Sequence, residues 1–252
     1  MQKIIYYLLN KFFMNEVENE ILTYFKKNNK KIVFDVGCYR GNFTTNFINN
    51  EKKLGVESDF FLFDPNPNVK NYLKIMLKNQ KVKFFNLALD NTNAEKNFYL
   101  NNFFEPSGSS LKNFNKEDKK WSGTRKLFFQ ILQPFKKIEG FSEINVKTQT
   151  LDNFCSTSNV SCIDVLKIDT EGNELNVLQG AKNLLSEDKI KLIYVEISET
   201  KQKFVEKERA VIELLSSYNF ELIKKYQIKS FGFLSGLQAS DNLFINKNLM
   251  HL

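Results

Sequence analysis

The stretch VLKIDTEGNEL, residues 165–175, joins a short apolar run to two carboxylates and a glycine, after which apolar residues recur at helical spacing. The run that ends at Ile168 is typical of a buried β-strand, and the residues after Gly172 are typical of a helix. Asp169 and Glu171 therefore follow a strand directly. Because parallel sheets bind their ligands beyond the C-terminal ends of the strands, both acids are candidate site residues.

The same strand-then-helix unit recurs along the chain. We expect strands at 32–36, 60–63, 82–86, 165–168 and 192–197, a helix that begins at 42–47, and further helices at 68–78, 175–185 and 211–218. Apolar strands that alternate with amphipathic helices indicate an α/β fold with a mostly parallel sheet covered on both faces. A length of 252 residues suits one such domain.

The cysteines and the histidine narrow the chemistry. Cys38, Cys155 and Cys162 form no CxxC pair, so the sequence favours neither a zinc ribbon nor a disulfide framework, and a reducing cytoplasm fits best. His251 is the only histidine, which disfavours a Ser-His-Asp or Cys-His hydrolase. Acid–base chemistry is therefore expected to use Asp, Glu, Lys or Tyr.

The formal charge of +7 suits three kinds of partner, namely a nucleic acid, an acidic membrane surface or an anionic substrate. Lysine is spread over the whole chain, so a general compositional bias is the other interpretation. Residues 1–30 are expected to form an amphipathic lead-in helix, either packed on the domain or in peripheral contact with a membrane. No window approaches the roughly 18 uninterrupted apolar residues of a membrane span.

The segment IVFDVGCYRGNFTTNF, residues 32–47, predicts a nucleotide-type cofactor. Gly37 and Gly41 allow a tight turn and a close approach of the backbone to a ligand, and Asn42 begins a helix whose N-terminus faces the strand ends. The DxGxxxG spacing differs from the GxGxxG of dinucleotide-binding enzymes. Asp64 ends the second strand, where a carboxylate can accept hydrogen bonds from both hydroxyls of a ribose. Together these features predict S-adenosylmethionine.

Further motifs follow in a characteristic order. They are FLFDPNPNVKNYL (61–73), VKFFNLALDNTNAEKNFYL (82–100), SGSSL (107–111), VKTQTLDNF (146–154), VLKIDTEGNELNVLQGAKNLL (165–185) and LIYVEIS (192–198). From Lys31 to Ser198 the chain resembles the FkbM-family methyltransferases. The resemblance implies a class I methyltransferase fold, a Rossmann-like seven-stranded sheet whose last strand is antiparallel, with FELIKKY (220–226) and DNLFIN (241–246) as the last two strands. It also implies O-methylation, often of sugars.

The expected cofactor-binding residues follow the first four strands. They are Asp35, Gly37, Cys38, Tyr39, Gly41, Asn42, Asp64, Pro65, Asn66, Asn86, Ala88 and Asp169. The adenine ring is expected at the end of the third strand. The chain departs from the family pattern at Asn173 and Ser198, where relatives often have histidine, and at Asp64, where glutamate is commoner.

The expected catalytic residues are the strand-end acids Asp169, Glu171 and Glu196. Methyl transfer to a hydroxyl requires a base near the acceptor oxygen, and these acids could supply it or hold a divalent cation. We favour Asp169 as the base. The simpler alternatives are that Asp169 caps a helix and that Asp64, which precedes a proline, starts a turn.

Between about 101 and 140 the alternation of strands and helices stops, and we expect a lid-like insertion in a methyltransferase domain that spans 31–252. Trp121 could stack on a pyranose and Arg125 could pair with an anion, while Ser109 and Ser110 are further candidate substrate residues. A solvated loop with a short helix is the alternative. The expected acceptor is a sugar hydroxyl of a glycan, a nucleotide sugar or a cell-surface polysaccharide precursor.

Two other classes of protein stay open. A nucleic-acid methyltransferase would explain the basic charge, but base-modifying enzymes usually carry Asn/Asp-Pro-Pro-aromatic after the fourth strand, where this chain has Asp169-Thr170-Glu171-Gly172. The other alternative is a catalytically silent module that binds S-adenosylmethionine or a glycan. Turnover of the cofactor separates this module from an enzyme.

Overall fold

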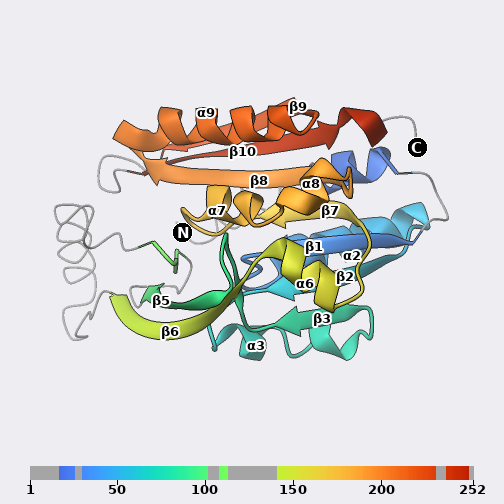
Figure 1. Ribbon diagram of the computed structural model, residues 1–252. Coiled ribbons are helices and arrows are strands. Elements are labelled where there is room, and N and C mark those ends of the chain that lie inside the picture. Colours follow the sequence, from blue (N-terminus) through green and yellow to red (C-terminus); the bar gives the residue numbers. More distant parts are fainter. Residues whose placement is uncertain (1–16, 26–29, 102–107, 113–140, 231–236, 250–252) are drawn as a thin grey trace, which may run out of the picture.

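The computed structural model describes residues 17–25, 30–101, 108–112, 141–230 and 237–249. Seven strands form the central sheet in the order β3-β2-β1-β7-β8-β10-β9 (Figure 1). Their bounds are β1 Lys31–Val36, β2 Ser58–Phe63, β3 Val82–Phe85, β7 Ile163–Ile168, β8 Ile190–Thr200, β9 Phe220–Ser230 and β10 Leu237–Asn246. Strand β10 is antiparallel to β8 and to β9, and the other neighbours are parallel. The predicted α/β fold with an antiparallel last strand is confirmed.

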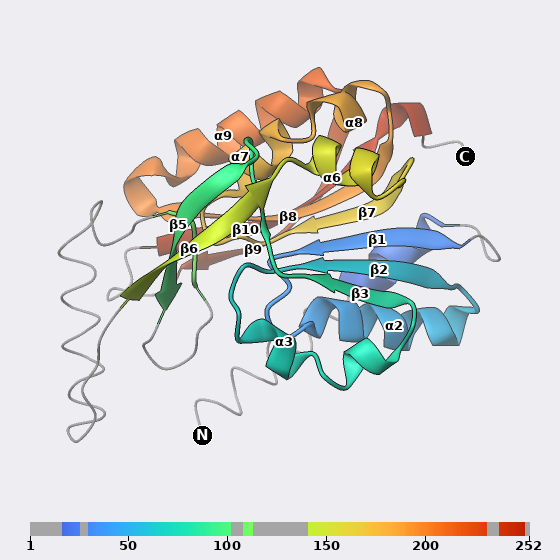
Figure 2. The ribbon, with the colours of Figure 1, turned by 60° about the horizontal axis from the view of Figure 1, so that its bottom comes forward.

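Helices cover both faces of this sheet (Figure 2). One face carries α2 (Asn42–Leu54), α3 (Val69–Tyr72) and the helical residues 17–23, and the other carries α6 (Leu151–Thr157), α7 (Glu174–Gln179), α8 (Lys182–Ser186) and α9 (Lys201–Ser217). Each face has its own apolar core. The inner strands β1, β2 and β7 are mostly apolar, and nearly all of their residues are buried, because both of their faces are covered.

Phenylalanine rings hold the site end of the sheet together. Phe34 of β1 stacks on Phe61 of β2 with 4.8 Å between ring centroids, and Phe63 meets Phe154 of α6 edge-on at 4.7 Å. Such aromatic pairs contribute about 0.5–1.5 kcal/mol each beyond the burial of their area. They fix the ends of β1 and β2 against α6.

A second, three-stranded sheet was not predicted from the sequence. Its order is β4-β6-β5, with β4 at Ala88–Leu89, β5 at Ala94–Asn101 and β6 at Phe141–Gln149. β5 and β6 are antiparallel and pair from Ala94↔Thr148 to Asn101↔Phe141. The expected insertion therefore begins and ends at the far end of this β5–β6 ladder. Within it the structure describes 108–112, which contacts β5 through a Tyr99↔Ser110 bridge.

The described part of the N-terminal segment packs on the α2 face of the sheet. Val17, Ile21 and Leu22 belong to the apolar core of that face, and Glu18 is fully buried beside them. Among the helices in the described parts of the chain, none combines the length and the apolar character that crossing a bilayer requires. Residues 1–16 of the expected lead-in helix lie outside the described residues.

Two expected helices are shorter than their sequence pattern indicates. The helix expected at 68–78 is observed as α3 and a 3₁₀ turn, η1 (Met76–Lys78), and a second such turn, η2 (Lys247–Leu249), follows β10. The helix expected at 175–185 is divided into α7 and α8 at Gly180. A Cβ at Gly180 would lie 2.1 Å from the backbone oxygen of Asp90, so the chain after β4 packs directly on the helix at this point.

Candidate active site

A pocket lies at the C-terminal ends of β1, β2 and β7, where their following loops meet the second sheet. The predicted site residues that line it are Gly37, Tyr39, Asp64, Pro65, Asn66, Ala88, Ser109, Asp169 and Glu171. Its remaining walls are Val36, Phe63, Leu87, Leu89, Phe98, Gly108, Leu111, Thr170 and Asn173. The strand-end rule therefore brings half of the predicted residues into one cavity.

Gly37 lets the loops after β1 and β7 touch. Its φ is +76°, and a Cβ there would lie 1.8 Å from the backbone oxygen of Asp169. Asp169 in turn donates its N–H to the Val36 oxygen at 2.9 Å. The close approach that Gly37 permits is thus to the protein's own backbone, and it fixes Asp169 beside the β1 loop.

Asp64 is a buried carboxylate at the pocket wall. One of its oxygens accepts the Tyr39 N–H at 3.0 Å and the other accepts the Asn66 N–H at 2.9 Å. Burial raises the pKa of Asp64 to about 6, although both amides and Lys167 act in the opposite direction. Since each carboxylate oxygen can accept more than one hydrogen bond, Asp64 can still receive two hydroxyl donors from a ligand. Asn86 is outside the pocket and donates to the Asp64 backbone oxygen at 2.8 Å.

Asp35 is placed behind the pocket rather than on its wall. It accepts the Thr44 hydroxyl at 2.8 Å and lies 3.1 Å from the ammonium group of Lys167. Lys167 also donates to the Gly37 oxygen at 3.1 Å and lies 3.5 Å from the Asp169 carboxylate. Burial opposes the charge of Lys167, but Asp35 and Asp169 outweigh it and raise the pKa of the ammonium group. Lys167 therefore links the β1 loop to Asp169.

Other predicted residues lie near the pocket without lining it. Cys38 is buried in the apolar core, and burial raises the pKa of its thiol well above the usual value. Gly41 caps α2 with φ +69°, and Asn42 is the first residue of that helix. Ser110 is buried and donates its hydroxyl to the Thr170 oxygen at 3.3 Å.

The third predicted acid, Glu196, does not line the pocket, and two predicted substrate residues cannot be compared with it. Glu196 lies on β8 opposite Asp241 of β10 and is not among the lining residues. Trp121 and Arg125 lie outside the described residues. Within the described chain, no group of three or more His, Cys, Asp and Glu side chains is placed to hold a metal ion. The structure therefore does not group the three predicted acids as cation ligands.

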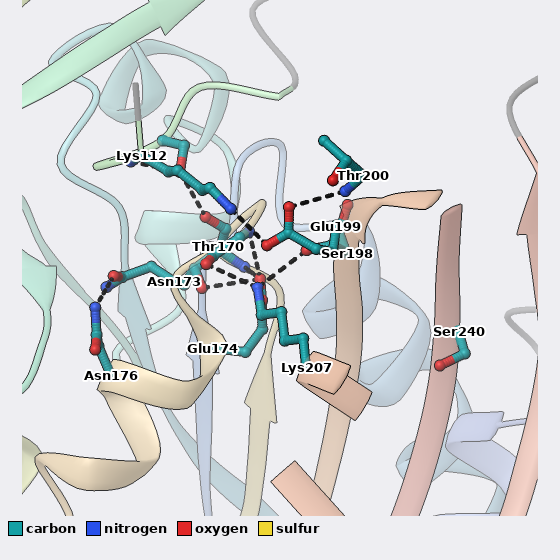
Figure 3. Close-up of polar contacts among 12 residues, drawn as sticks. Lys112, Thr170, Asn173, Glu174, Asn176, Ser198, Glu199, Thr200, Lys207 and Ser240 are labelled. Carbon is teal, nitrogen blue, oxygen red and sulfur yellow. Dashed lines mark hydrogen bonds and ion pairs between the residues drawn. The ribbon is translucent and has the colours of Figure 1, made fainter. Parts of the chain in front are cut away.

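The loop 169–173 owes its shape to residues that the sequence analysis did not select. Glu171 has φ +52° and Gly172 has φ +112°. Glu174 accepts the N–H of Gly172 at 2.7 Å and the N–H of Thr170 at 3.3 Å, so one carboxylate spans Glu171 (Figure 3). Lys207 of α9 contacts Glu174 at 2.6 Å. The only sequence signal for Glu174 is its place in the KIDTEGNE motif, and Lys207 carries none.

Asn173 is also fixed within the protein. Its amide donates to the Leu89 oxygen at 3.4 Å and to the Asp90 carboxylate at 3.3 Å, and its side-chain oxygen accepts from Asn176 at 2.7 Å. Asn173 thus ties the β7 loop to the end of β4. The pocket lining as a whole combines apolar residues of β4 and β5 with the carboxylates of Asp64, Asp169 and Glu171.

Comparisons with known proteins identify the family and the fold of the chain. The family model of the methyltransferase FkbM domain matches residues 35–222. The chain is 26% identical over 217 residues to the 2-O-methyltransferase NoeI of Sinorhizobium fredii, an alignment that covers 84% of this chain and 80% of that protein. It also resembles the crystal structure of methyltransferase FkbM from Methylobacillus flagellatus, with a TM-score of 0.51 at 12% identity. That match covers 88% of this chain but 44% of the other, so it shows the fold alone.

Proposed function

The chain belongs to the FkbM methyltransferase family, and we propose that it transfers a methyl group from S-adenosylmethionine to a hydroxyl group of a saccharide. The observation that carries the proposal is the lining of the pocket, which combines Asp64, apolar residues of the second sheet and two acids of the β7 loop. We assign Asp64 and the apolar residues of the second sheet to a first end of the pocket, and Asp169 and Glu171 to a second end. A nucleoside suits the first end, and a hydroxyl-rich acceptor suits the second.

The residues at the first end fit the adenosine part of the cofactor. Asp64 is held by two backbone amides, so its carboxylate is already oriented toward the pocket before any ribose hydroxyl arrives. Ala88, Leu89 and Phe98 supply an apolar wall for an adenine ring. When bound, S-adenosylmethionine supplies an electrophilic methyl group on a sulfonium centre.

Asp169 is the residue to which we assign the base. It lines the pocket, its side chain is 33% exposed, and the contact between the β1 and β7 loops fixes its backbone. Its carboxylate is placed to accept the proton that the acceptor hydroxyl must lose, a role that typically contributes 10²–10⁴-fold to the rate. The neighbouring Lys167 holds the Asp169 side chain by an ion pair.

The proposed acceptor class follows from the two acids assigned to the second end of the pocket. Carboxylates accept hydrogen bonds from hydroxyl groups, and Glu171 lies beside Asp169 where a second hydroxyl of a sugar ring can bind. The 2-O-methyltransferase NoeI, by its name, methylates an oxygen. A glycan, a nucleotide sugar or a polysaccharide precursor is therefore the proposed substrate.

The test is a transfer assay with isotope-labelled S-adenosylmethionine. The protein is incubated with a panel of nucleotide sugars and glycans, with an oligonucleotide pool in parallel, and the products are analysed by mass spectrometry. The expected result is a gain of one methyl group on a saccharide. Labelling of the oligonucleotides alone, or cofactor binding without transfer to any acceptor, would reject the proposal.

A further inference from the structure

We propose that Lys207 is a positioning residue for methyl transfer, which acts through Glu174 to hold the loop 169–173 with Asp169 and Glu171 toward the pocket. The proposal rests on the function proposed above. Lys207 lies on α9, outside the pocket, and reaches the loop from the side of β8 (Figure 3).

The ammonium group of Lys207 uses three acceptors within the protein. It donates to the Gly172 oxygen at 2.7 Å, to the Ser198 oxygen at 3.0 Å and to the Glu174 carboxylate at 2.6 Å. A lysine ammonium has three N–H donors, so these contacts match its full capacity. One side chain thereby joins α9, the end of β8 and the loop after β7.

Glu174 connects Lys207 to the loop that lines the pocket. Its side chain is fully buried, and the oxygen that does not contact Lys207 accepts from the Gly172 N–H, the Thr170 N–H and the Thr170 hydroxyl. These donors lie on both sides of Glu171, whose φ of +52° is unfavourable for a residue with a side chain. The Glu174 carboxylate therefore stabilises the conformation that places Glu171 in the pocket.

The end of β8 carries a second link to the pocket wall. Glu199, next to Ser198, pairs with Lys112 at 2.5 Å, and the segment 108–112 lines the pocket with Gly108, Ser109 and Leu111. The hydroxyl of Ser110 in this segment donates to the Thr170 oxygen. The β7 loop is thus held from α9 on one side and from segment 108–112 on the other.

Loss of Lys207 should affect turnover more than cofactor affinity. Without its cation Glu174 becomes a buried, unpaired carboxylate, and the loop that it organises relaxes. A displacement of about 1 Å in a reacting group can lower a rate by about 10²-fold. Lys207 contacts the β7 loop and the end of β8, whereas the Asp64 carboxylate of the proposed adenosine end is held by the Tyr39 and Asn66 amides, so the adenosine end should keep its place.

The experiment compares Lys207→Met with Lys201→Met, an exposed lysine at the start of the same helix. For Lys207→Met we expect a cofactor Kd within about threefold of wild type and a kcat lower by about 10²-fold, whereas Lys201→Met should match wild type in both. Glu174→Gln removes the charge but keeps an oxygen that can accept the Gly172 N–H. Because the two residues act as a unit, the double variant Lys207→Met/Glu174→Gln should lose no more turnover than Lys207→Met alone.

Amide hydrogen exchange supplies a readout that needs no acceptor. The amides of Thr170 and Gly172 should exchange at least about tenfold faster in Lys207→Met, while the Tyr39 amide, which donates to Asp64, should be unchanged.

Wild-type turnover in Lys207→Met, parallel loss of cofactor affinity and turnover, or multiplicative losses in the double variant would overturn the proposal. If Lys207→Met does not fold, Lys207→Gln, which removes the cation but keeps a polar side chain, decides by the same exchange and turnover criteria. If wild type methylates no acceptor, the proposed function fails. Independently of that result, unchanged amide exchange at Thr170 and Gly172 in Lys207→Met would refute the positioning role.

Discussion

Cofactor affinity should weaken as the pH falls through about 6, because Asp64 must be ionised to accept hydrogen bonds from two ribose hydroxyls. Burial raises the pKa of this carboxyl from 3.8 to about 6 in the ligand-free protein. Above that pH the carboxylate is available to both hydroxyls, and below it a bound proton competes with them. The affinity is therefore present above pH 6 and is lost progressively below it.

The magnitude follows from the position of the pKa. If binding requires the ionised form, the ionised fraction falls about tenfold between pH 7 and pH 5, and the apparent affinity for S-adenosylmethionine falls with it. Calorimetry over this range measures the effect directly. The chain contains one histidine, His251, so few other groups titrate in the same window.

Asp64→Asn is the matched control, since its amide keeps the shape of the side chain but does not titrate. We expect this variant to bind the cofactor more weakly at every pH, because hydrogen bonds to a charged group contribute about 1.5–3 kcal/mol, and to show a flat profile. A flat profile in wild type would refute the reasoning. So would an equal decline in wild type and Asp64→Asn, since another group would then be responsible.

Three further predictions concern single side chains. Asp169→Asn should fold and bind the cofactor nearly normally but lose about 10²–10⁴-fold in turnover in the methyl-transfer assay, and near-wild-type turnover would remove it as the base. Gly37→Ala should lower the melting temperature far more than Gly55→Ala. Both glycines have positive φ, but a Cβ at Gly37 would lie 1.8 Å from a backbone oxygen, whereas a Cβ at Gly55 would meet nothing within 4 Å. Equal melting temperatures of the two variants would contradict this prediction. Burial raises the pKa of Glu18 from 4.5 to about 8, so its stabilising effect is full below pH 4.5 and is lost as the pH rises through 8. Glu18→Gln should therefore melt several degrees above wild type at pH 9, and a lower melting temperature there would oppose the prediction.

The inner strands of the central sheet could be predicted because they are mostly apolar on both faces. The strand expected at 60–63 is observed as β2 (Ser58–Phe63), and the one expected at 192–197 as β8 (Ile190–Thr200). The second sheet was missed although Ile144, Val146 and Thr148 of β6 alternate with polar residues, a pattern typical of a half-buried strand. The break at Gly180 could not be predicted, since it depends on packing against Asp90 from a distant part of the chain.

In the candidate site, too, some residues could be predicted from the local sequence and others depend on contacts between distant segments. Asp64 and Asp169 could be selected because they directly follow strands of a parallel sheet, a position that the local sequence reveals. Lys167 and Lys207 could not be selected, because their roles arise from contacts between residues far apart in the sequence. Lys167 is 130 residues from its partner Gly37, and Lys207 is 35 residues from its partner Gly172. Asp35 occupies a strand end by the same rule, but its side chain is directed to Lys167 and Thr44 inside the protein.

The most direct test of the account follows a deuterated methyl group from S-adenosylmethionine into an acceptor. Wild type and Asp169→Asn, both shown by calorimetry to bind the cofactor, are incubated with the saccharide panel, and the position of the label is determined by tandem mass spectrometry and NMR. The account predicts an intact deuterated methyl group on a saccharide oxygen with wild type and a rate lower by about 10²–10⁴-fold with Asp169→Asn. A label on nitrogen or carbon, or on nucleic acid, or no transfer despite cofactor binding, would contradict it.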